Sequence, residues 1–495
     1  MAEGTAAKRP IGAAADEVAA EHLDVLIVGA GISGIDAAYR LQKSCPGKSW
    51  AILEARSAIG GTWDLFRFPG IRSDSDMYTL GFPFRPWQGE KAIADGGDIR
   101  AYVEETAREF GIDARIRFGH KAVRADWSSS SARWTVEVAN GRRLTCSFLF
   151  MCSGYYDYEN GYRPEWPGEA DFAGRIVHPQ FWPEDLDVSG KRIVVIGSGA
   201  TAVTLVPALA ETAAQVTMLQ RSPSYIVARP SRDRLARWLQ ARLPARTADA
   251  LVRWKNVLLG MYFFSLARRK PERVRRKLLE LVSAQLEPGY DVARHFSPAY
   301  NPWDQRVCLV PDGDLFAAIK AGRVAIVTDR IERFTETGLR LGSGEELAAD
   351  IVVTATGLIV KLLGGMALSV DGAPVNVGDR LSYRGMMLSD VPNFAVIFGY
   401  TNASWTLKSD LTARAVCRLL NHMDRRGHAI CLPRLGAAEV ERRPLLDFSS
   451  GYVSRAAGSL PSQGAKAPWR APQNYLKDIA AMRFHRVADG TMEFR

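Results

Sequence analysis

Residues 23–34 read LDVLIVGAGISG, and this stretch decides the fold class. Its residues 25–28 form a continuous apolar run, which is typical of a strand covered on both faces of a parallel sheet. A glycine turn of the form G-x-G-x-x-G follows, and residues 35–41 continue in a helical pattern. The order strand, glycine turn, helix predicts the first unit of an α/β fold with a parallel sheet.

Each glycine of this turn has its own physical task. Gly29 permits the tight turn, Gly31 lets the backbone approach a pyrophosphate, and Gly34 lets the helix pack on the strand. The next strand, residues 49–54, ends in Glu54, near the ~20-residue separation expected for a ribose-binding carboxylate. We therefore expect an adenine dinucleotide at a first site. Its predicted residues are Gly29, Gly31, Ser33, Gly34 and Glu54.

A second unit of the same design lies at residues 191–202, KRIVVIGSGATA, with Ala202 as the third turn residue. Its second strand, residues 216–220, is followed by Arg221 where an acid would be expected. An arginine can pair with a 2′-phosphate, which favours NADPH over NADH, although Arg221 could also be a solvated loop cation. Two sites of opposite ribose chemistry imply FAD at the first and NADPH at the second. The residues predicted here are Gly197, Ser198, Gly199, Ala200, Thr201, Arg221 and Ser222.

The glycine pair at residues 60–61 would let the backbone lie close to a flavin, with Trp63 beside the ring. The alternative is a plain glycine turn with a core tryptophan. Gly61, Thr62 and Trp63 are accordingly predicted to contact the first cofactor.

Two strands that end in small residues flank the second unit, at 148–154 and 350–357. They indicate two nested Rossmann-like domains, in which the first is interrupted and the second inserted. The predicted division is a flexible tail at 1–22, an FAD domain at 23–154 and 364–495, an NADP domain at 155–363, and a helical insertion within it at 224–298.

The composition is that of an ordinary folded chain: 495 residues, 47% hydrophobic and 24% charged. Its six cysteines include no C-x-x-C pair, which excludes a disulfide scaffold, a zinc ribbon and a dithiol reductase, and we expect no metal site. Nothing in residues 1–23 resembles a signal peptide, and the longest apolar stretch, 257–267, is too short for a membrane span. We expect a cytoplasmic protein, soluble or at most peripheral.

The formal charge of +10 is concentrated between residues 229 and 277, which otherwise resemble amphipathic helices. The ordinary interpretation is a solvated helical face, and the alternative is contact with a membrane surface or a protein. Nucleic acid is the weakest candidate, because no interleaved aromatics or recognisable binding module accompany these charges. The sequence does not predict an oligomeric state.

Residues 172–183, FAGRIVHPQFWP, match the pattern F-x-G-x-x-x-H-x-x-x-W-P at every specified position. This segment resembles the fingerprint of Baeyer–Villiger monooxygenases, whereas the related nitrogen- and sulfur-oxidising enzymes usually carry Tyr where Trp182 stands. Residues 60–81, 301–316 and 399–408 are similar to the subgroup that contains the mycobacterial ethionamide-activating monooxygenase.

The resemblance implies an FAD enzyme that uses NADPH and O2 to insert oxygen beside a ketone carbonyl, via a C4a-peroxyflavin. The products are esters or lactones, and sulfide oxidation is an implied side activity. By the same resemblance Arg306 is the permanent cation above the flavin, Asp74 orients it, and His178, grouped with the cofactor residues, couples the domains. An arginine suits an anionic peroxide because it cannot lose its proton.

The sequence departs from the family pattern at Gln305, where many members have a lysine that helps to hold the NADP phosphate. Coenzyme selectivity would then depend more on Arg221. Two alternatives to ketone oxidation stay open: a flavin monooxygenase that oxidises nitrogen or sulfur, and a catalytically idle flavoprotein that senses redox state or binds a partner.

Overall fold

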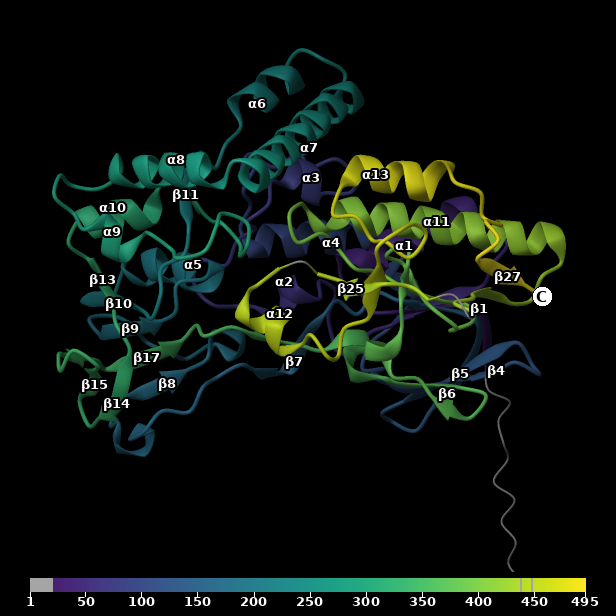
Figure 1. Cartoon of the computed structure of the whole chain (residues 1–495), viewed down its shortest axis with the longest axis horizontal. Coiled ribbons are helices and arrows are strands. Elements are labelled where there is room, and N and C mark those ends of the chain that lie inside the picture. The colour runs from purple at the N-terminus through teal and green to yellow at the C-terminus, as the bar shows by residue number, and fades with distance from the viewer. Residues whose placement is uncertain (1–20, 437–438, 447) are drawn as a thin grey trace, which may run out of the picture.

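A computed structural model describes residues 21–436, 439–446 and 448–495 (Figure 1). The first glycine turn follows β1, an inner strand of a nine-stranded sheet built from two separate parts of the chain. β1 (His22–Val28) pairs in parallel with β2 (Trp50–Leu53) and β6 (Arg143–Met151). The other strands are β3 (Ile116–Arg117), β4 (Ala122–Ser128), β5 (Arg133–Val138), β19 (Ala367–Val370), β20 (Ala373–Pro374) and β23 (Phe394–Val396).

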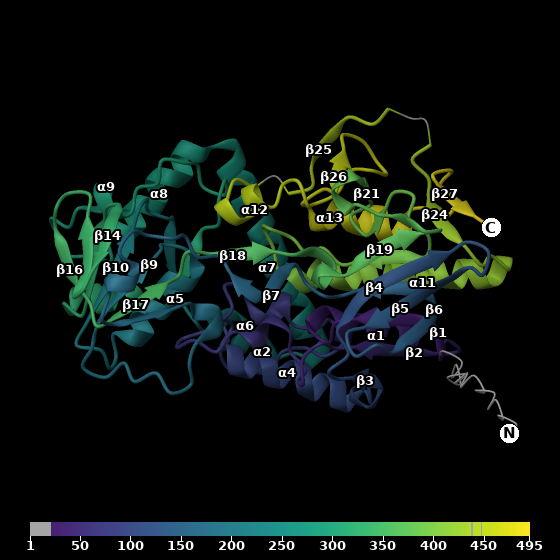
Figure 2. The ribbon, with the colours of Figure 1, turned by 90° about the horizontal axis from the view of Figure 1, so that it is seen from below.

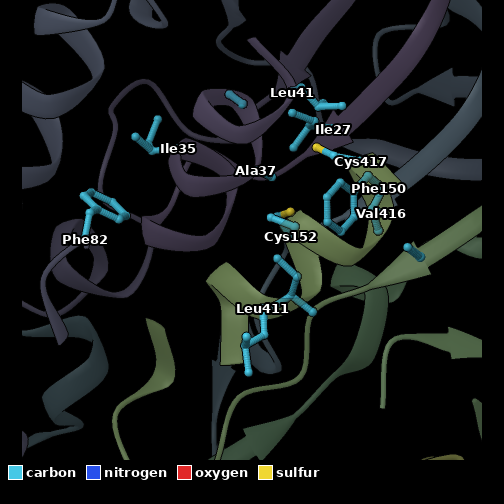
Figure 3. Packing of buried hydrophobic residues seen from close by; sticks show 14 of the residues in the cluster. Ile27, Ile35, Ala37, Leu41, Phe82, Phe150, Cys152, Leu411, Val416 and Cys417 are labelled. Carbon is cyan, nitrogen blue, oxygen red and sulfur yellow. The ribbon is translucent and has the colours of Figure 1, made fainter. Parts of the chain in front are cut away.

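Both faces of β1 are buried, as its apolar run predicts. Val25 and Ile27 pack against a helical layer, and Leu26 packs on the opposite face against β4–β6 and β23. The helices are α1 (Ile32–Ser44), α4 (Gly96–Glu109) and α11 (Trp405–Arg426). Figure 3 shows Ile27 and Phe150 among side chains of α1 and α11. α11, from the last quarter of the chain, thus completes the core that the N-terminal unit begins.

The second glycine turn lies in a separate five-stranded parallel sheet, in the order β13-β10-β9-β17-β8. These strands are β8 (Arg175–Val177), β9 (Arg192–Ile196), β10 (Gln215–Gln220), β13 (Val324–Thr328) and β17 (Ile351–Thr354). α5 (Ala200–Leu209) and α10 (Asp314–Lys320) pack on one face. An antiparallel sheet of β14 (Ile331–Thr335), β15 (Gly338–Leu341) and β16 (Glu346–Ala348) covers the other. The predicted α/β class with two Rossmann-like sheets is confirmed.

A two-stranded antiparallel ribbon carries the chain between the sheets. β7 (Tyr156–Gly161) leads from the first sheet to the second, and β18 (Leu358–Val360) leads back. The domain boundaries predicted at residues 154 and 363 lie beside this ribbon and stay a prediction. Of the predicted tail, residues 1–20 fall outside the described part of the chain, and β1 already begins at His22.

The predicted insertion at 224–298 is mostly helical but opens with a strand that sequence reasoning missed. β11 (Ile226–Arg229) pairs with β12 (Cys308–Pro311). The helices are α6 (Arg234–Gln240), α7 (Ala245–Arg269), α8 (Pro271–Ser283) and α9 (Val292–His295). α6 and α7 project from the body of the molecule (Figure 1). α7 reaches the first sheet's side, where Arg253 Nη1 donates to the carbonyls of Tyr78 and Gly81, each at 2.9 Å.

Short elements complete the chain, and those near the C-terminus gather on one side of the molecule (Figure 2). They are α2 (Thr62–Leu65), α3 (Met77–Leu80), α12 (Gly451–Arg455), α13 (Tyr475–Ile479), β21 (Ser382–Tyr383), β22 (Met387–Leu388), β24 (Cys431–Pro433), β25 (Arg442–Pro444), β26 (Ser462–Gly464) and β27 (Met492–Phe494). Within residues 21–436, 439–446 and 448–495, no helix combines the length and apolar character needed to cross a bilayer.

Candidate active site

Both glycine turns open on one cavity of about 1320 Å³. Sixteen of the predicted site residues line it: Gly29, Gly31, Ser33, Glu54, Gly61, Thr62, Trp63, Asp74, Gly197, Ser198, Gly199, Ala200, Thr201, Arg221, Ser222 and Arg306. Gly34 and His178 do not line it. The fold therefore gathers residues that lie up to 277 positions apart in the sequence around a single space.

The first turn is shaped by close backbone contacts that only glycine allows. Gly29 has a φ of +107°, and a Cβ at Gly34 would lie 1.8 Å from the carbonyl oxygen of Gly29. Gly34 therefore acts indirectly, since it seats α1 against the strand. A Cβ at Gly61 would lie 3.1 Å from Gly31 Cα, so the second glycine loop faces the first.

The helix N-termini at the cavity fit the phosphates of two dinucleotides. Gly31 is the N-cap of α1 and Gly199 that of α5, and neither supplies a side-chain hydrogen bond to the first turn. The first N–H groups of a helix have no partner within the helix and suit a phosphate. A Cβ at Gly199 would meet no atom within 4 Å, which leaves room for a phosphate at the second turn.

Glu54 is buried at the end of β2 and holds the first loop together. Its Oε2 accepts from the amide of Ala30 at 2.7 Å, and its Oε1 accepts from the amide of Arg56 at 2.8 Å. Burial raises the pKa of this carboxyl. Each oxygen still has a lone pair for a ribose hydroxyl, so the residue fits the sugar of FAD.

Ser33 and Trp405 join the first turn to the start of α11. Trp405 Nε1 donates to Ser33 Oγ at 2.8 Å, and the indole ring stacks on Tyr155 with centroids 5.1 Å apart. Ser33, predicted as a residue of the first cofactor site, thus also orients an aromatic wall. Because α11 begins at Trp405 beside the cavity, its dipole favours negative charge at this wall.

The second turn presents cations at the edge where β10 and β13 end. Arg221 is exposed, and no carboxylate within the described residues pairs with it. The Asp329 amide donates to the Gln220 carbonyl at 3.0 Å, which sets Arg330 at the same edge. Sequence reasoning missed Arg330, although its position directly after a strand of the same sheet could have marked it. Ser198 Oγ donates to the Ser222 carbonyl at 2.9 Å and closes the loop below.

Arg306 and Asp74 meet in the cavity, although 231 residues separate them. Arg306 Nη1 donates to Asp74 Oδ2 at 2.7 Å, and the two side chains are 34% and 37% exposed. The carboxylate raises the pKa of Arg306 above its ordinary value, so the guanidinium stays cationic. Within the described residues this is the one hydrogen bond of Arg306, which leaves its other N–H donors available.

The loop that carries Arg306 is held from two sides. Arg268 of α7 forms an ion pair with Asp304 at 2.6 Å, and the Ser449 amide donates to the Asp304 carbonyl at 2.9 Å. Trp303 has a φ of +71°, a conformation unfavourable for a side chain of this size. These contacts fix the loop in a conformation that it would not adopt alone.

Two tyrosines that the sequence analysis did not select form the wall beside Arg306. The hydroxyl oxygens of Tyr155 and Tyr156 lie 2.7 Å apart. Burial raises the pKa of both phenols, so both keep their protons and can donate. Their position directly after the domain boundary predicted at residue 154 was the available signal.

His178 directly follows β8, and its ring lies against the ribbon between the sheets. A Cβ at Gly161 would lie 2.2 Å from its Cε1, and its Nδ1 accepts from the Gln180 amide at 3.2 Å. Gln180 Nε2 in turn donates to the carbonyl of Asp157 at 2.7 Å. Burial lowers the pKa of His178 and favours the neutral ring. This placement separates His178 from the cofactor-lining residues and puts it against the linker strand β7.

Two Rossmann-like units that share one cavity define the class as an oxidoreductase that binds two dinucleotides. Comparison with known families narrows this class. The chain belongs to the flavin-binding monooxygenase-like family, whose model matches residues 93–362, and an NAD(P)-binding Rossmann-like model matches residues 27–88.

Relatives of this chain cover nearly its whole length. The FAD-containing monooxygenase EthA of Mycobacterium tuberculosis is 57% identical over 96% of this chain and 98% of its own. A probable FAD-binding monooxygenase, AlmA of an Acinetobacter species, is 46% identical over 96% of each chain. The chain is thus an FAD-containing monooxygenase, an enzyme that uses NADPH, O2 and a small-molecule substrate.

Solved structures share the fold. A steroid monooxygenase bound to NADP has 25% identity and a TM-score of 0.72, over 84% of this chain and 88% of its own. An open structure of cyclohexanone monooxygenase has 19% identity and a TM-score of 0.72, over 96% of this chain and 100% of its own. The expected cofactors, FAD and NADPH, are confirmed.

Proposed function

We propose that this enzyme is a Baeyer–Villiger monooxygenase, which inserts one oxygen atom beside a ketone carbonyl to give an ester or lactone. Sulfide oxidation would be a side activity. The observation that carries the proposal is the cationic guanidinium of Arg306, oriented by Asp74 at 2.7 Å inside the shared cavity. Trp182 of the fingerprint and the likeness to a cyclohexanone monooxygenase support the same choice of substrate class.

Arg306 would act on the oxygen atoms that gain negative charge. FAD, when bound, would supply the electrons that activate O2, and those electrons would come from NADPH as hydride. Arg306 holds its N–H donors toward the cavity and stabilises negative charge on the carbonyl oxygen of the ketone. Asp74 fixes the guanidinium before the reaction starts, so little reorganisation is needed.

The pair also joins the two predicted domains. Asp74 belongs to the predicted FAD domain, 23–154 and 364–495, and Arg306 belongs to the predicted NADP domain, 155–363. Their hydrogen bond therefore forms only when the two domains hold this relative position. We infer that the pair also makes the position of the Arg306 guanidinium depend on domain closure.

The remaining wall residues would bind cofactor and exclude water. One side of the cavity is enclosed by the aromatic rings of Tyr155, Tyr156 and Trp405. Exclusion of water from this side would limit the release of activated oxygen as hydrogen peroxide. Arg221 and Arg330 would bind the 2′-phosphate of NADPH. Their positive charges would replace the lysine that many family members have where this chain has Gln305.

Product analysis tests the proposal. Purified enzyme with NADPH and O2 is offered linear, cyclic and aryl ketones and one sulfide, and mass spectrometry identifies the products. We expect an ester or lactone one oxygen heavier than the ketone. Turnover of the sulfide or of amines without any ketone turnover would instead establish the nitrogen- or sulfur-oxidising alternative.

An Arg306→Ala variant separates oxygenation from flavin reduction. It should leave reduction of the flavin by NADPH nearly intact while the ester disappears. Arg124→Ala, which removes an exposed arginine of β4, is the matched control and should keep full activity. Ester formation at the parent rate in Arg306→Ala would show that the assigned role is wrong.

A further inference from the structure

α7 carries an apolar stripe that stays largely exposed, although its Trp254 also contacts Tyr475 of α13, with ring centroids 5.9 Å apart. Leu251, Trp254, Leu258 and Tyr262 are 49%, 42%, 51% and 60% exposed. Their spacing of three, four and four residues places them on one face of the helix, over roughly 17 Å at 1.5 Å per residue. An unbroken stripe of this length differs from the scattered apolar residues of an ordinary surface.

α6, which packs against α7, also carries exposed apolar residues. It adds Leu235 and Trp238, each about half exposed, and Phe263 of α7 is half exposed as well. α6 and α7 are packed together and project away from both sheets, as Figure 1 shows. We call these seven residues the hairpin patch: Leu235, Trp238, Leu251, Trp254, Leu258, Tyr262 and Phe263.

The same segment holds the excess charge of the protein. Residues 234–277 contain thirteen Lys and Arg and two acidic residues, Asp249 and Glu272, for a formal charge of +11. The whole chain carries +10, so all other residues together amount to −1. Arg269 follows Tyr262 by seven residues and therefore lies on the same face of α7 as the stripe.

We propose that the hairpin patch docks on the surface of an anionic lipid membrane. Leucine, tryptophan and tyrosine on one face of a basic helix are the features of a helix that lies in the membrane interface. The positive charge is complementary to acidic headgroups. A second copy of this chain fits poorly, because a symmetric contact would bring two strongly basic segments together.

The buried face of α7 connects this patch to the cavity. Asn256 Nδ2 donates at 2.9 Å to Asp76, two residues after Asp74, and Phe264 contacts Trp303 with ring centroids 5.7 Å apart. Trp303 lies three residues before Arg306. One helix thus touches lipid on one side and both segments of the Arg306–Asp74 pair on the other.

Vesicle sedimentation of the FAD-loaded full chain tests the proposal. The wild type is mixed at 0.1 M salt with vesicles of phosphatidylcholine alone or with an equal part of phosphatidylglycerol. We expect partition onto the acidic vesicles to exceed that onto the neutral ones at least tenfold, and to fall at 0.5 M salt.

Two variants separate the apolar and the charged contribution. Leu251→Gln/Leu258→Gln/Tyr262→Gln should lower the partition at least tenfold. Arg269→Gln/Arg273→Gln/Arg276→Gln should do the same, since each charge near an acidic surface contributes roughly fivefold. Phe118→Gln removes an exposed aromatic residue elsewhere and should bind as the wild type does. Thermal unfolding of each variant verifies the fold.

Several outcomes would overturn the proposal. These are wild-type protein left in the supernatant with acidic vesicles, or folded variants of the patch that sediment as well as the wild type. A patch variant that changes only the oligomeric state would assign the surface to self-association, and selective binding to duplex DNA would assign it to nucleic acid. None of these measurements requires turnover, so the outcome is independent of the ketone assignment.

Discussion

Replacement of Asp74 by asparagine separates orientation of Arg306 from folding. In the wild type, Asp74 Oδ2 accepts from Arg306 Nη1 at 2.7 Å. Asp74→Asn keeps the shape and one acceptor oxygen but removes the charge that fixes the guanidinium. Because one donor to a developing negative charge contributes 10²- to 10³-fold, partial misplacement should lower ester formation roughly 10- to 100-fold. That factor corresponds to about 1.4–2.7 kcal/mol of transition-state stabilisation.

The effect of the same substitution on stability should be small. Both side chains are about one-third exposed, and ion pairs at such positions contribute about 0–1 kcal/mol. The expected signature is therefore a large loss of oxygenation with an almost unchanged urea midpoint. A structural role alone would lower both together.

Three measurements decide the point. Anaerobic stopped-flow follows flavin reduction by NADPH, which should change less than about twofold. Product yield per NADPH consumed should fall, with hydrogen peroxide making up the difference. The control, Asp424→Asn, breaks the 2.9 Å pair with Lys48 far from the cavity and should not affect coupling. If Asp74→Asn forms ester within twofold of the wild-type rate, the positioning argument fails.

Three further substitutions test the second nucleotide site, the histidine beside the ribbon and a buried ion pair. Arg221→Ala should lower the NADPH-over-NADH ratio of kcat/KM roughly 10- to 100-fold, because a charge-assisted bond to the 2′-phosphate is lost, and an unchanged ratio would make Arg221 a solvent-facing cation. His178→Gln should be less stable than the wild type at pH 7.5, and its deficit in Tm should shrink at pH 5.5. Burial lowers the pKa of His178 in the folded chain below its ordinary value near 6.5. The unfolded chain therefore binds more protons, and the stability of the wild type falls as the pH drops below about 6.5. A Tm deficit that does not change with pH would contradict this. Lys408→Met should destabilise the protein by about 3–5 kcal/mol in urea titrations, because it leaves Asp478, 3.0 Å away and 1% exposed, without its cation. Lys408→Met/Asp478→Leu should recover much of that loss, and an equal loss in both variants would show that the pair is not coupled.

The sequence predicted the two nucleotide-binding units because each depends on local physics. Strand burial at residues 25–28 and the backbone contacts of Gly29 and Gly34 follow from short-range sterics that residue types report directly. The α/β class and the two cofactors followed from these units. The strand β11 was missed because its partner β12 lies about 80 residues further on.

The site could be predicted only as separate fragments. Nothing in the local pattern joins Asp74 to Arg306, and their pairing came from family resemblance. Trp405 escaped because its contacts, with Ser33 and Tyr155, come from elements far away in sequence. The contact of Ser33 with Trp405 was missed for the same reason, since this partner lies more than 370 residues away in the sequence.

The outgoing and returning strands, β7 and β18, restrict how the two nucleotide-binding halves can move. A single connecting strand would allow rotation about every φ and ψ along it. Here the register pairs Leu358 with Gly161 and Val360 with Tyr156, so sliding or torsion would break backbone hydrogen bonds, whereas bending out of the ribbon's plane would keep them. The ribbon therefore bends out of its plane more easily than it twists or slides. Since Tyr156 stands at one end of it, bending shifts the wall beside Arg306 whenever the halves swing.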